Sequence, residues 1–584
     1  MELLFPENVL WMIIVGFIVA FVLAFGIGAN DVANSFGTSV GAKVLTLRQA
    51  CILGAIFETL GAILLGAKVS DTIRKGIIDV GSYNGTEEVL MVGNICALSG
   101  SCIWLLIATF LSLPVSGTHS IVGATLGFAL VAHGAKGVNW IKAGMIVGSW
   151  FISPVLSGLV SIGLFWVISL LVLRKEDQLR HGLRLLPIFY GCTLVINVFS
   201  IFYDGPEMLG FDKIPLWGIF ILSFGSGLIC AFLVRVVMVP WQRKKILNSA
   251  QEISYNAATT EKSECNGAVK FTFGSQVNKI GGGSGGNSAD SSRRPSYTES
   301  MENPIIMPEK PTENGSVKSG AQLLTHLVKE DEEKEKEKLV PTVKRVQDVT
   351  PSPSMKSFKT LLTQEFGPGK TTPPKVTNGT VKLDISDSSN MEYSPASSQD
   401  LEAQKKERES IKDSPESVKL FSWLQILTAI FGSFAHGGND VSNAIGPLVA
   451  LWIIGLEGSA QQKSATPIWI LLYGGVGISI GLFVWGRRVI KTMGEDLTKI
   501  TPSSGFCIEI GSALTVLVAS NIGIPVSTTH CKVGSIVSVG RFRSRANVDW
   551  KLFRNIFLAW IVTLPVSGGI SAALFAGLRL LVPH

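Results

Sequence analysis

Residues Gly28–Gly37 read G-A-N-D-V-A-N-S-F-G, and a closely similar stretch, G-G-N-D-V-S-N-A-I-G, returns at Gly437–Gly446. A second motif, P-V-S-G-T-H at Pro114–His119, returns as P-V-S-T-T-H at Pro525–His530. A tryptophan and a Ser-Gly pair follow each second motif, namely Trp150, Ser157, Gly158 and Trp560, Ser567, Gly568. The three offsets are 409, 411 and 410 residues, so the chain contains a duplicated unit.

Composition predicts that the duplicated unit lies in a membrane. Of the 584 residues, 47% are hydrophobic and 16% are charged, and the mean hydropathy is +0.38. A soluble protein of this length carries about a quarter charged residues. Apolar runs of about 18 residues or more, long enough to cross a bilayer as helices, recur in both halves. They lie at 9–28, 47–67, 91–112, 115–133, 140–173, 185–203, 214–239, 421–455, 466–486, 507–522, 524–540 and 553–582.

These runs predict an all-α, polytopic membrane protein with about twelve transmembrane or re-entrant helices. The segments 115–133 and 524–540 are rich in small residues, and the sequence leaves open whether they span or re-enter. No basic helix accompanies the net charge of +7, so we predict contact with a lipid bilayer and no binding to nucleic acid. Eight cysteines without a C-x-x-C pair indicate neither a disulfide framework nor a bound metal.

Composition also divides the chain into three parts. The N-terminal membrane block covers 1–240, a linker covers 241–418, and the C-terminal membrane block covers 419–584. Many Ser, Pro and Gly residues and an alternating charged run predict that the linker is disordered. We interpret it as a solvated tether. Its Ser-Pro pairs, such as Ser394-Pro395 and Ser414-Pro415, are also candidate phosphorylation sites.

Basic residues in the loops predict the orientation of the chain. They cluster at 174–184, 243–245, 487–488 and 541–545, and the positive-inside rule places these loops and the linker in the cytoplasm. Both termini and the 68–90 loop then lie outside the cell. Asn84, in the sequon Asn84-Gly85-Thr86, is therefore a candidate glycosylation site, although sequons also occur in the linker. Arg74 and Lys75 depart from the rule.

The number of segments between the two copies predicts how they are related in space. Seven membrane segments separate the start of the first unit from the start of the second. An odd number reverses the direction of insertion, so the two units are predicted to form an inverted-topology repeat. Such repeats are characteristic of secondary transporters, which bind substrate near the bilayer midplane between the repeats.

Asn30-Asp31 and Asn439-Asp440 are candidate sodium ligands. An unpartnered aspartate near the bilayer centre costs about 3 kcal/mol, and oxygen ligands suit a small hard cation. A proton on each aspartate is one alternative, and a purely structural capping role is another. The glycines in and around each motif predict that the helix unwinds here, which a membrane interior tolerates only inside protein or beside a cavity.

The second motif is a candidate anion site. Ser116 and Thr118 in the first copy, and Ser527, Thr528 and Thr529 in the second, follow a proline and open short helical elements. Free N–H groups and hydroxyls at the start of a helix form a cradle for an anion such as phosphate. No arginine occurs in these motifs, so helix termini and co-bound cations would have to balance the charge of the anion.

Five further polar residues lie in or beside apolar surroundings. Glu58 and Glu509 are predicted to face a transport pathway, with paired structural acids as the alternative. His119 and His530 are expected to bond neighbouring helices, with a proton shuttle as the alternative. Lys532, which has no basic counterpart in the first copy, is either an anion contact or an interfacial lysine.

One enzyme-like pattern does not predict an enzyme. Gly37–Gly41 fits the G-x-S-x-G pattern of hydrolases. A nucleophile elbow needs a strand–turn–helix setting, and the surroundings here are apolar helical segments. The second copy has no serine at this place, so we predict that the protein is not an enzyme.

The paired motifs resemble those of the inorganic phosphate transporter (PiT) family, and most closely those of its animal sodium-dependent phosphate symporters. The resemblance covers both membrane blocks and leaves out the linker. It implies uptake of monovalent inorganic phosphate by alternating access, with sodium as co-substrate and no other cofactor. It also implies a multi-pass protein of the plasma membrane with external termini.

The resemblance assigns roles by motif position. It implies that phosphate is bound by Asn34, Ser116, Thr118, Asn443, Ser527, Thr528 and Thr529. It implies that sodium is bound by Asn30, Asp31, Asn439 and Asp440, and that transport needs Glu58 and Glu509.

Three alternative functions remain open at this point. The same fold would serve a proton-coupled transporter, a sulfate transporter, or a phosphate sensor or receptor with little flux. Some family members act as virus receptors, a property of outer loops that is not carried over to this chain. A homo-oligomer is left open.

Overall fold

The computed structural model describes residues 5–203, 210–248 and 406–581, apart from the side chains of Asp212 and Arg488. Most of the predicted linker, including Ser394, lies outside the described residues. The two membrane blocks belong to one compact unit, 1–247 together with 395–584. The described residues are helical and contain no strand, only isolated bridges between residue pairs, so the predicted all-α class is confirmed.

The helices and helical turns of the first half are α1 (Glu7–Gly41), α2 (Leu47–Lys75), η1 (Val80–Tyr83), α3 (Glu87–Phe110), α4 (Gly117–His133), η2 (Gly134–Gly137), α5 (Trp140–Ile168), η3 (Ser169–Leu173), α6 (Gln178–Tyr203), η5 (Phe211–Lys213), α7 (Leu216–Leu233) and η6 (Val234–Met238). Those of the second half are α12 (Pro415–Glu457), α13 (Ile468–Trp485), α14 (Arg487–Lys491), η7 (Thr492–Asp496), α15 (Pro502–Ile522), α16 (Thr528–Arg543), α17 (Trp550–Leu578) and η8 (Arg579–Leu581).

Each of the twelve predicted membrane segments corresponds to a helix. Within the described residues, 10 helices are long and apolar enough to cross a membrane. The short helices α4 and α16 account for the other two segments, with 17 and 16 residues. The polytopic prediction is therefore confirmed.

Helices α4 and α16 each form an antiparallel hairpin with the helix before them. Each follows a non-helical turn, at 111–116 and 523–527, and packs on the helix before it. At the far end of α4, the ring of His133 packs on Tyr83, just before α3, with ring centroids 4.4 Å apart. At the far end of α16, Arg543 donates to Thr501, just before α15. Both short helices thus end on the side from which the preceding helix entered.

The predicted unwinding at the two Asn-Asp motifs is wrong, because α1 and α12 are continuous through them. The glycines serve close helix packing instead. A Cβ atom on Gly28 would lie 2.0 Å from the carbonyl oxygen of Ile478 in α13. A Cβ atom on Gly437 would lie 1.9 Å from the carbonyl oxygen of Glu58 in α2. Small residues that let two backbones approach are typical of helix contacts in membranes.

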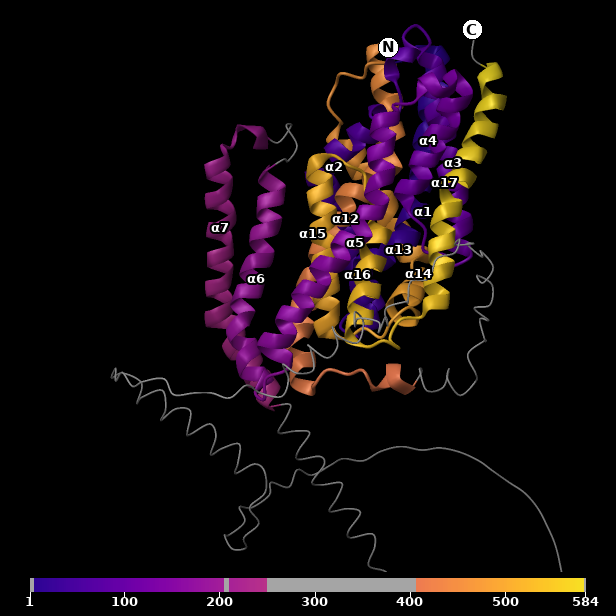
Figure 1. Cartoon of the computed structure of the whole chain (residues 1–584). Helices are drawn as coiled ribbons and strands as arrows, with labels where there is room; N and C mark the ends of the chain where they lie inside the picture. Colours follow the sequence, from indigo (N-terminus) through magenta and orange to yellow (C-terminus); the bar gives the residue numbers. More distant parts are fainter. Residues whose placement is uncertain (1–4, 204–209, 249–405, 582–584) are drawn as a thin grey trace, which may run out of the picture. The chain divides into compact units, whose positions relative to one another are not determined.

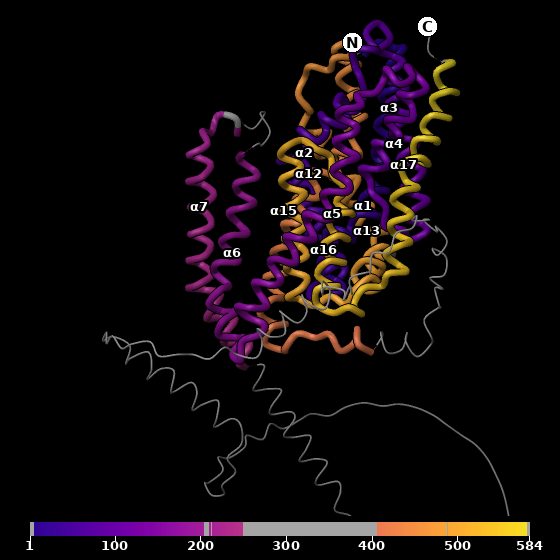
Figure 2. Tube along the Cα trace, in the orientation of Figure 1, coloured from indigo at the N-terminus to yellow at the C-terminus, as the bar shows by residue number. Residues whose placement is uncertain are grey.

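Equivalent helices of the two halves make equivalent contacts. Helix α1 packs on α13 and α3, and α12 packs on α2 and α15. Helix α17 packs on α3 and α4, and α5 packs on α15 and α16. Asn139 caps α5 and Asp549 caps α17, each by accepting a hydrogen bond from the main-chain N–H three residues on. Figures 1 and 2 show these helices of the two halves interleaved in one bundle, with α6 and α7 as a pair at its side.

The two ends of the bundle are distinct. Both chain ends lie at one of them, which we call the termini end, and both edges of the linker lie at the other, which we call the linker end (Figure 1). Helix α1 starts at the termini end, whereas α12 starts at the linker end. The two helices that carry the Asn-Asp motifs therefore run in opposite directions.

Helical structure extends past both edges of the predicted linker, 241–418. The helix that begins with α7 runs on to Asn248, and α12 begins at Pro415. Packing explains both extensions, because the rings of Trp241 and Trp423 lie 5.6 Å apart. Ser414 caps α12 by accepting a hydrogen bond from the N–H of Ser417.

Arg74, which departs from the positive-inside rule, is buried inside the protein. Its guanidinium lies 2.9 Å from Asp71 and donates to the main-chain carbonyls of Gln462 and Ser464, also at 2.9 Å. Lys75 lies 3.6 Å from the same aspartate. Both charges are thus engaged within the protein, and Arg74 ties the end of α2 to the loop before α13.

Candidate functional site

The two Asn-Asp motifs meet the two Pro-Val-Ser motifs inside the bundle. Helices α1 and α12 supply the first pair, and the N-termini of α4 and α16 supply the second. The predicted sodium and phosphate ligands all lie here, and each is exposed by 5% or less. We call this group the central site: Asn30, Asp31, Asn34, Ser116, Thr118, Asn439, Asp440, Asn443, Ser527, Thr528 and Thr529.

Asparagine–threonine hydrogen bonds join the two halves across the central site. Asn34 Nδ2 donates to Thr529 Oγ1 at 2.9 Å, and Asn443 Nδ2 donates to Thr118 Oγ1 at the same distance. Each threonine donates in turn to the main-chain carbonyl of the valine in the opposite Pro-Val-Ser turn, at 3.1 and 2.8 Å. The duplicated motifs therefore bind each other reciprocally, which the sequence alone did not predict.

The two aspartates lie in one chain of hydrogen bonds. Asn34 Nδ2 approaches Asp31 Oδ1 at 3.1 Å and Thr528 Oγ1 at 3.3 Å. Thr528 Oγ1 lies 3.2 Å from both carboxylate oxygens of Asp440. The carboxylates of both repeats thus belong to one site, rather than to two separate ones.

The first asparagine of each motif bonds its own turn. Asn30 Nδ2 donates to Thr109 Oγ1 and to the carbonyl of Leu113, both at 3.0 Å, and its Oδ1 accepts from the N–H of Val115 at 3.2 Å. Asn439 Nδ2 donates to a carbonyl of the equivalent turn before α16 at 2.9 Å. These bonds hold the turns against α1 and α12.

The N-termini of α4 and α16 face the central site. Ser116 Oγ accepts from the N–H of His119 at 3.2 Å, and Ser527 Oγ accepts from the N–H of His530 at 3.1 Å. Both serines are therefore N-caps. The remaining N–H groups of a first helical turn have no partner within the helix and carry partial positive charge. Together these two helix starts suit an anion.

Four buried oxygens of the central site lack a hydrogen-bond partner among the described residues. They are Asp31 Oδ2, Asn34 Oδ1, Asn439 Oδ1 and Asn443 Oδ1. Leaving buried acceptors unpaired is costly. Carboxylate and amide oxygens are the ligands that hard cations prefer. The donor set therefore fits a small cation such as sodium; Asp31 and Asn439 were predicted as sodium ligands, whereas Asn34 and Asn443 were predicted as phosphate ligands.

Glu58 and Glu509 lie outside the central site and differ from each other. Glu58 accepts from Ser35 Oγ at 2.6 Å. Glu509 is fully buried and lies 2.9 Å from Lys532 Nζ, which is fully buried too. Lys532 is thus neither an interfacial lysine nor a member of the central site, and the structure gives it a carboxylate partner.

Three hydroxyls on α1 were missed by sequence analysis. Thr38 Oγ1 donates to Glu509 Oε1, and Ser39 Oγ lies 3.3 Å from the same oxygen. Ser35 is the donor to Glu58. The available signal was their spacing, since they follow Asp31 by one to two helical turns within an otherwise apolar helix.

His119 and His530 pack on each other in a ring cluster beside the central site. Their ring centroids lie 4.4 Å apart. His119 packs on Trp150 at 3.7 Å, and His530 packs on Trp560 at 3.8 Å. His530 Nδ1 lies 3.0 Å from the carbonyl oxygen of Trp150. The cluster joins α4 and α16 to α5 and α17. Trp150 and Trp560, which belong to the third match between the halves, therefore each contact the opposite half.

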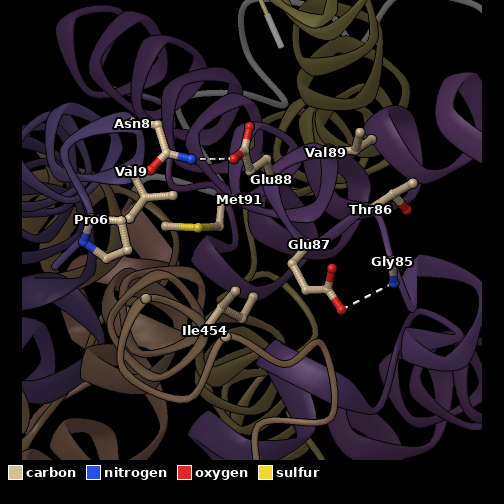
Figure 3. Close-up of a pocket in the computed structure, with 12 residues that line it drawn as sticks. Pro6, Asn8, Val9, Gly85, Thr86, Glu87, Glu88, Val89, Met91 and Ile454 are labelled. Carbon is tan, nitrogen blue, oxygen red and sulfur yellow. Dashed lines mark hydrogen bonds between the residues drawn. The ribbon is translucent and has the colours of Figure 1, made fainter. Parts of the chain in front are cut away.

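One cavity lies away from the central site. It has a volume of about 380 Å³ and is lined by the start of α1, the start of α3 and the end of α12 (Figure 3). Asn8 donates to Glu88 there at 2.5 Å. Twenty-two residues of α1 separate Val9 from Asp31, about 33 Å at the usual helical rise. Asn84, the predicted glycosylation site, is exposed at this termini end.

Taken together, the helices and the central site define a multi-pass membrane protein with a buried polar site between two related halves. The chain belongs to the phosphate transporter family, whose profile it matches over residues 27–571. It is 46% identical to human sodium-dependent phosphate transporter 2, covering 98% of both chains. It is 46% identical to sodium-dependent phosphate transporter 1 of Xenopus tropicalis, covering 98% of this chain and 96% of the relative.

Among solved structures, the chain resembles one described as the sodium-dependent phosphate transporter. The TM-score is 0.65 and the identity is 28%, over 98% of this chain and all of the other. The family predicted from the paired motifs is therefore confirmed.

Proposed function

We propose that this protein transports inorganic phosphate across the plasma membrane together with sodium ions. The observation that carries the proposal is the pairing of two carboxylates and three unpartnered amide oxygens with two helix N-termini in one buried site. Cation ligands and an anion cradle therefore lie side by side. The names of the relatives, which describe sodium-dependent phosphate transporters, support the same function.

Sodium is assigned to Asp31, Asp440 and the unpartnered amide oxygens around them. Asn439 supplies such an oxygen, whereas Asn30 Oδ1 already accepts from a main-chain N–H. Asn30 therefore acts mainly by holding its turn in place. Sodium suits this set because it takes hard oxygen ligands and remains charged at any pH.

Phosphate is assigned to the starts of α4 and α16. Their N–H groups and the hydroxyls of Ser116, Thr118, Ser527, Thr528 and Thr529 supply hydrogen bonds, and the helix termini supply partial positive charge. The monovalent ion fits best, because the central site contains no arginine or lysine to balance a second charge. Co-bound sodium would then complete the charge balance and couple the two solutes.

The opposite directions of α1 and α12, and the reciprocal asparagine–threonine bonds, support an inverted-topology repeat around this site. In such a repeat one half rocks against the other and exposes the site to each side in turn. We place the termini end outside the cell and the linker end in the cytoplasm, because basic loop residues gather at the linker end.

The test is uptake of radiolabelled phosphate into proteoliposomes that contain the purified protein, with sodium or choline outside. We expect uptake only with sodium, and its loss in both Asp31→Asn and Asp440→Asn. Lys75→Met, in a half-exposed ion pair, is the matched control and should retain uptake.

Other results would replace the proposal in defined ways. Uptake driven by a pH gradient and indifferent to sodium would make the cation a proton. Uptake of sulfate in preference to phosphate would change the anion. Phosphate binding without uptake under either gradient would refute transport and favour a sensor.

A further inference from the structure

The two halves differ in polarity one layer away from the central site. Toward the linker end lies a layer of buried polar residues, namely Ser35, Thr38, Ser39, Glu58, Glu509 and Lys532. The repeat-equivalent positions, toward the termini end, are all apolar and buried, namely Ala444, Pro447, Leu448, Ile478, Leu98 and Ile121. We call these the polar layer and the apolar layer.

Motif offsets establish four of these equivalences, and helix contacts establish the other two. For Glu58 and Ile478, the contacts are those of Gly437 and Gly28, which are equivalent in the two motifs. Gly437 packs against the carbonyl of Glu58, and Gly28 packs against the carbonyl of Ile478. For Glu509 and Leu98, the contacts are those of Gly511 and Gly100. A Cβ atom on Gly511 would meet two serines of α5, and one on Gly100 would meet the equivalent serines of α17.

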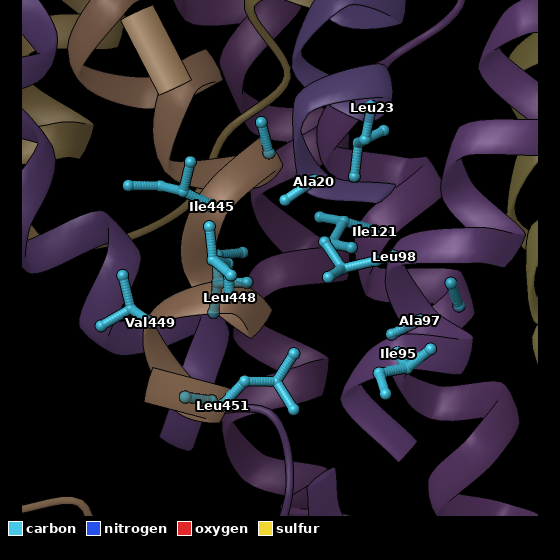
Figure 4. Packing of buried hydrophobic residues seen from close by; sticks show 14 of the residues in the cluster. Ala20, Leu23, Ile95, Ala97, Leu98, Ile121, Ile445, Leu448, Val449 and Leu451 are labelled. Atoms are coloured by element: carbon cyan, nitrogen blue, oxygen red, sulfur yellow. The ribbon is translucent and has the colours of Figure 1, made fainter. Parts of the chain in front are cut away.

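The apolar layer forms one continuous cluster. Leu98, Ile121, Leu448 and Ile478 are all exposed by 1% or less and belong to the same group of packed side chains. Figure 4 shows Leu98 next to Ile121, with Leu448 in the same cluster. Separating these surfaces would break no ion pair.

In contrast, the polar layer is held together by charge. Glu509 Oε2 lies 2.9 Å from Lys532 Nζ, and Glu509 Oε1 accepts from Thr38 and Ser39. Glu509 is on α15, Lys532 is on α16, and the two hydroxyls are on α1. One carboxylate therefore binds α1 to the hairpin of α15 and α16 in the second half, on the linker side of Asp31.

A carboxylate and two hydroxyls are also ligands that a small hard cation would take. Here the ammonium of Lys532 supplies the positive charge. A buried carboxylate needs such a partner, since removing one member of a buried ion pair leaves an uncompensated charge. In the first half, Leu98 stands in place of the acid and Ile121 in place of the lysine, so no cation is needed there.

We propose that Lys532 is a tethered counter-cation, and that its pair with Glu509 latches α1 to α15 and α16 on the linker side of the central site. Neither residue touches the transported ions; both position α1. Opening the site toward the linker end requires α1 to leave Glu509, whereas the equivalent layer toward the termini end is an apolar surface without an ion pair. This inference rests on the proposed transport function.

The experiment compares Lys532→Met, Glu509→Gln and the double variant with the wild-type full-length chain in proteoliposomes. Phosphate uptake is measured over a range of external sodium concentrations, and thermal unfolding is measured on the same preparations in detergent. Lys75→Met carries the same chemical change in a half-exposed ion pair and serves as the control.

We expect each single variant to lose about tenfold or more of its uptake at low sodium, because each leaves a buried charge unpaired. In Lys532→Met, raising sodium should restore uptake, because sodium takes the place of the ammonium against Glu509. Its sodium dependence should therefore lie at higher concentration and be steeper than that of the wild type. The double variant should recover part of the loss in uptake and in unfolding midpoint, because neither buried charge is then left unpaired, and Lys75→Met should match the wild type in both.

Two results would overturn the proposal. A double variant that is no better than the single variants in uptake and unfolding would show that the two residues do not compensate each other. A wild-type sodium dependence in Lys532→Met would show that no counter-cation is missing. If Lys532→Met does not fold, the test rests on whether the double variant recovers folding and uptake relative to the single variants. If the wild type itself takes up no phosphate, the proposed function fails, and the unfolding comparison still tests the pair.

Discussion

Close packing of α2 on α12 makes Gly437 a sensitive position. A Cβ atom there would lie 1.9 Å from the carbonyl oxygen of Glu58 and 2.6 Å from its carbonyl carbon and Cα. The opposing atoms are backbone, so no side-chain rotation relieves the clash. Non-bonded heavy atoms rest about 3.5 Å apart, so Gly437→Ala must separate the two helices by roughly 1.5 Å.

Two opposing terms set the size of the effect. Overpacking of this kind costs about 1–3 kcal/mol, and sometimes more, whereas alanine favours a helix over glycine by about 1 kcal/mol. We expect a net destabilisation of up to about 2 kcal/mol, together with a displacement of Asn439 and Asp440, which follow Gly437 by two and three residues along α12. A shift of about 1 Å at a site that positions ions is enough to lower turnover by about a hundredfold.

Thermal unfolding in detergent and sodium-dependent phosphate uptake measure the two consequences separately. Gly569→Ala on α17 is the matched control, because a Cβ atom there would have no neighbour within 4 Å. This control should match the wild type or unfold at slightly higher temperature. Wild-type unfolding and uptake in Gly437→Ala, or equal damage from both substitutions, would refute the packing argument.

Three further predictions concern other parts of the bundle. Arg74→Gln should destabilise the protein by about 1–3 kcal/mol, because it leaves two main-chain carbonyls without their donor, whereas Lys75→Gln should change the unfolding midpoint little. Asn443→Ala and Thr118→Val should each lower uptake, and together should cost less than the sum of the two, since they remove one hydrogen bond between the halves; additive losses would contradict this. Thr86→Ala should abolish a glycan at Asn84, which a gel-mobility shift after glycosidase treatment of the wild type would reveal; an unchanged wild-type band would place the sequon in an unmodified position.

Much of the fold could be predicted, because the lengths of the apolar runs indicate the membrane helices and the repeated motifs indicate the duplication. Apolar runs predicted twelve membrane segments, and each corresponds to a helix. The predicted unwinding failed because glycine has two uses in a membrane helix, and sequence does not distinguish them. At Gly28 and Gly437 the use is close approach of two backbones, which depends on α13 and α2 packing opposite them.

The sequence predicted which residues form the central site, but not which of them are hydrogen-bonded to each other. The motifs supplied Asp31 and Asp440, but no local pattern indicates that Asn34 bonds a threonine 495 residues away in the chain. The polar layer was harder still. Lys532 reads as an interfacial lysine, because its partner Glu509 lies 23 residues away, on a helix of its own.

The reciprocal bonds also explain why the motifs of the two halves remain alike while the layers around them differ. Asn34 needs Thr529, and Asn443 needs Thr118, so a change in either motif disrupts a contact with the other half. Leu98 and Glu509 do not contact each other: Glu509 accepts from hydroxyls of α1, whereas Leu98 packs in an apolar cluster, so the two positions were free to diverge. The repeat is therefore symmetric at the central site and asymmetric in the adjoining layers. Such a repeat can bind the same ions in either orientation of the halves. Its two layers are held by different forces, one by apolar packing and the other by a buried ion pair.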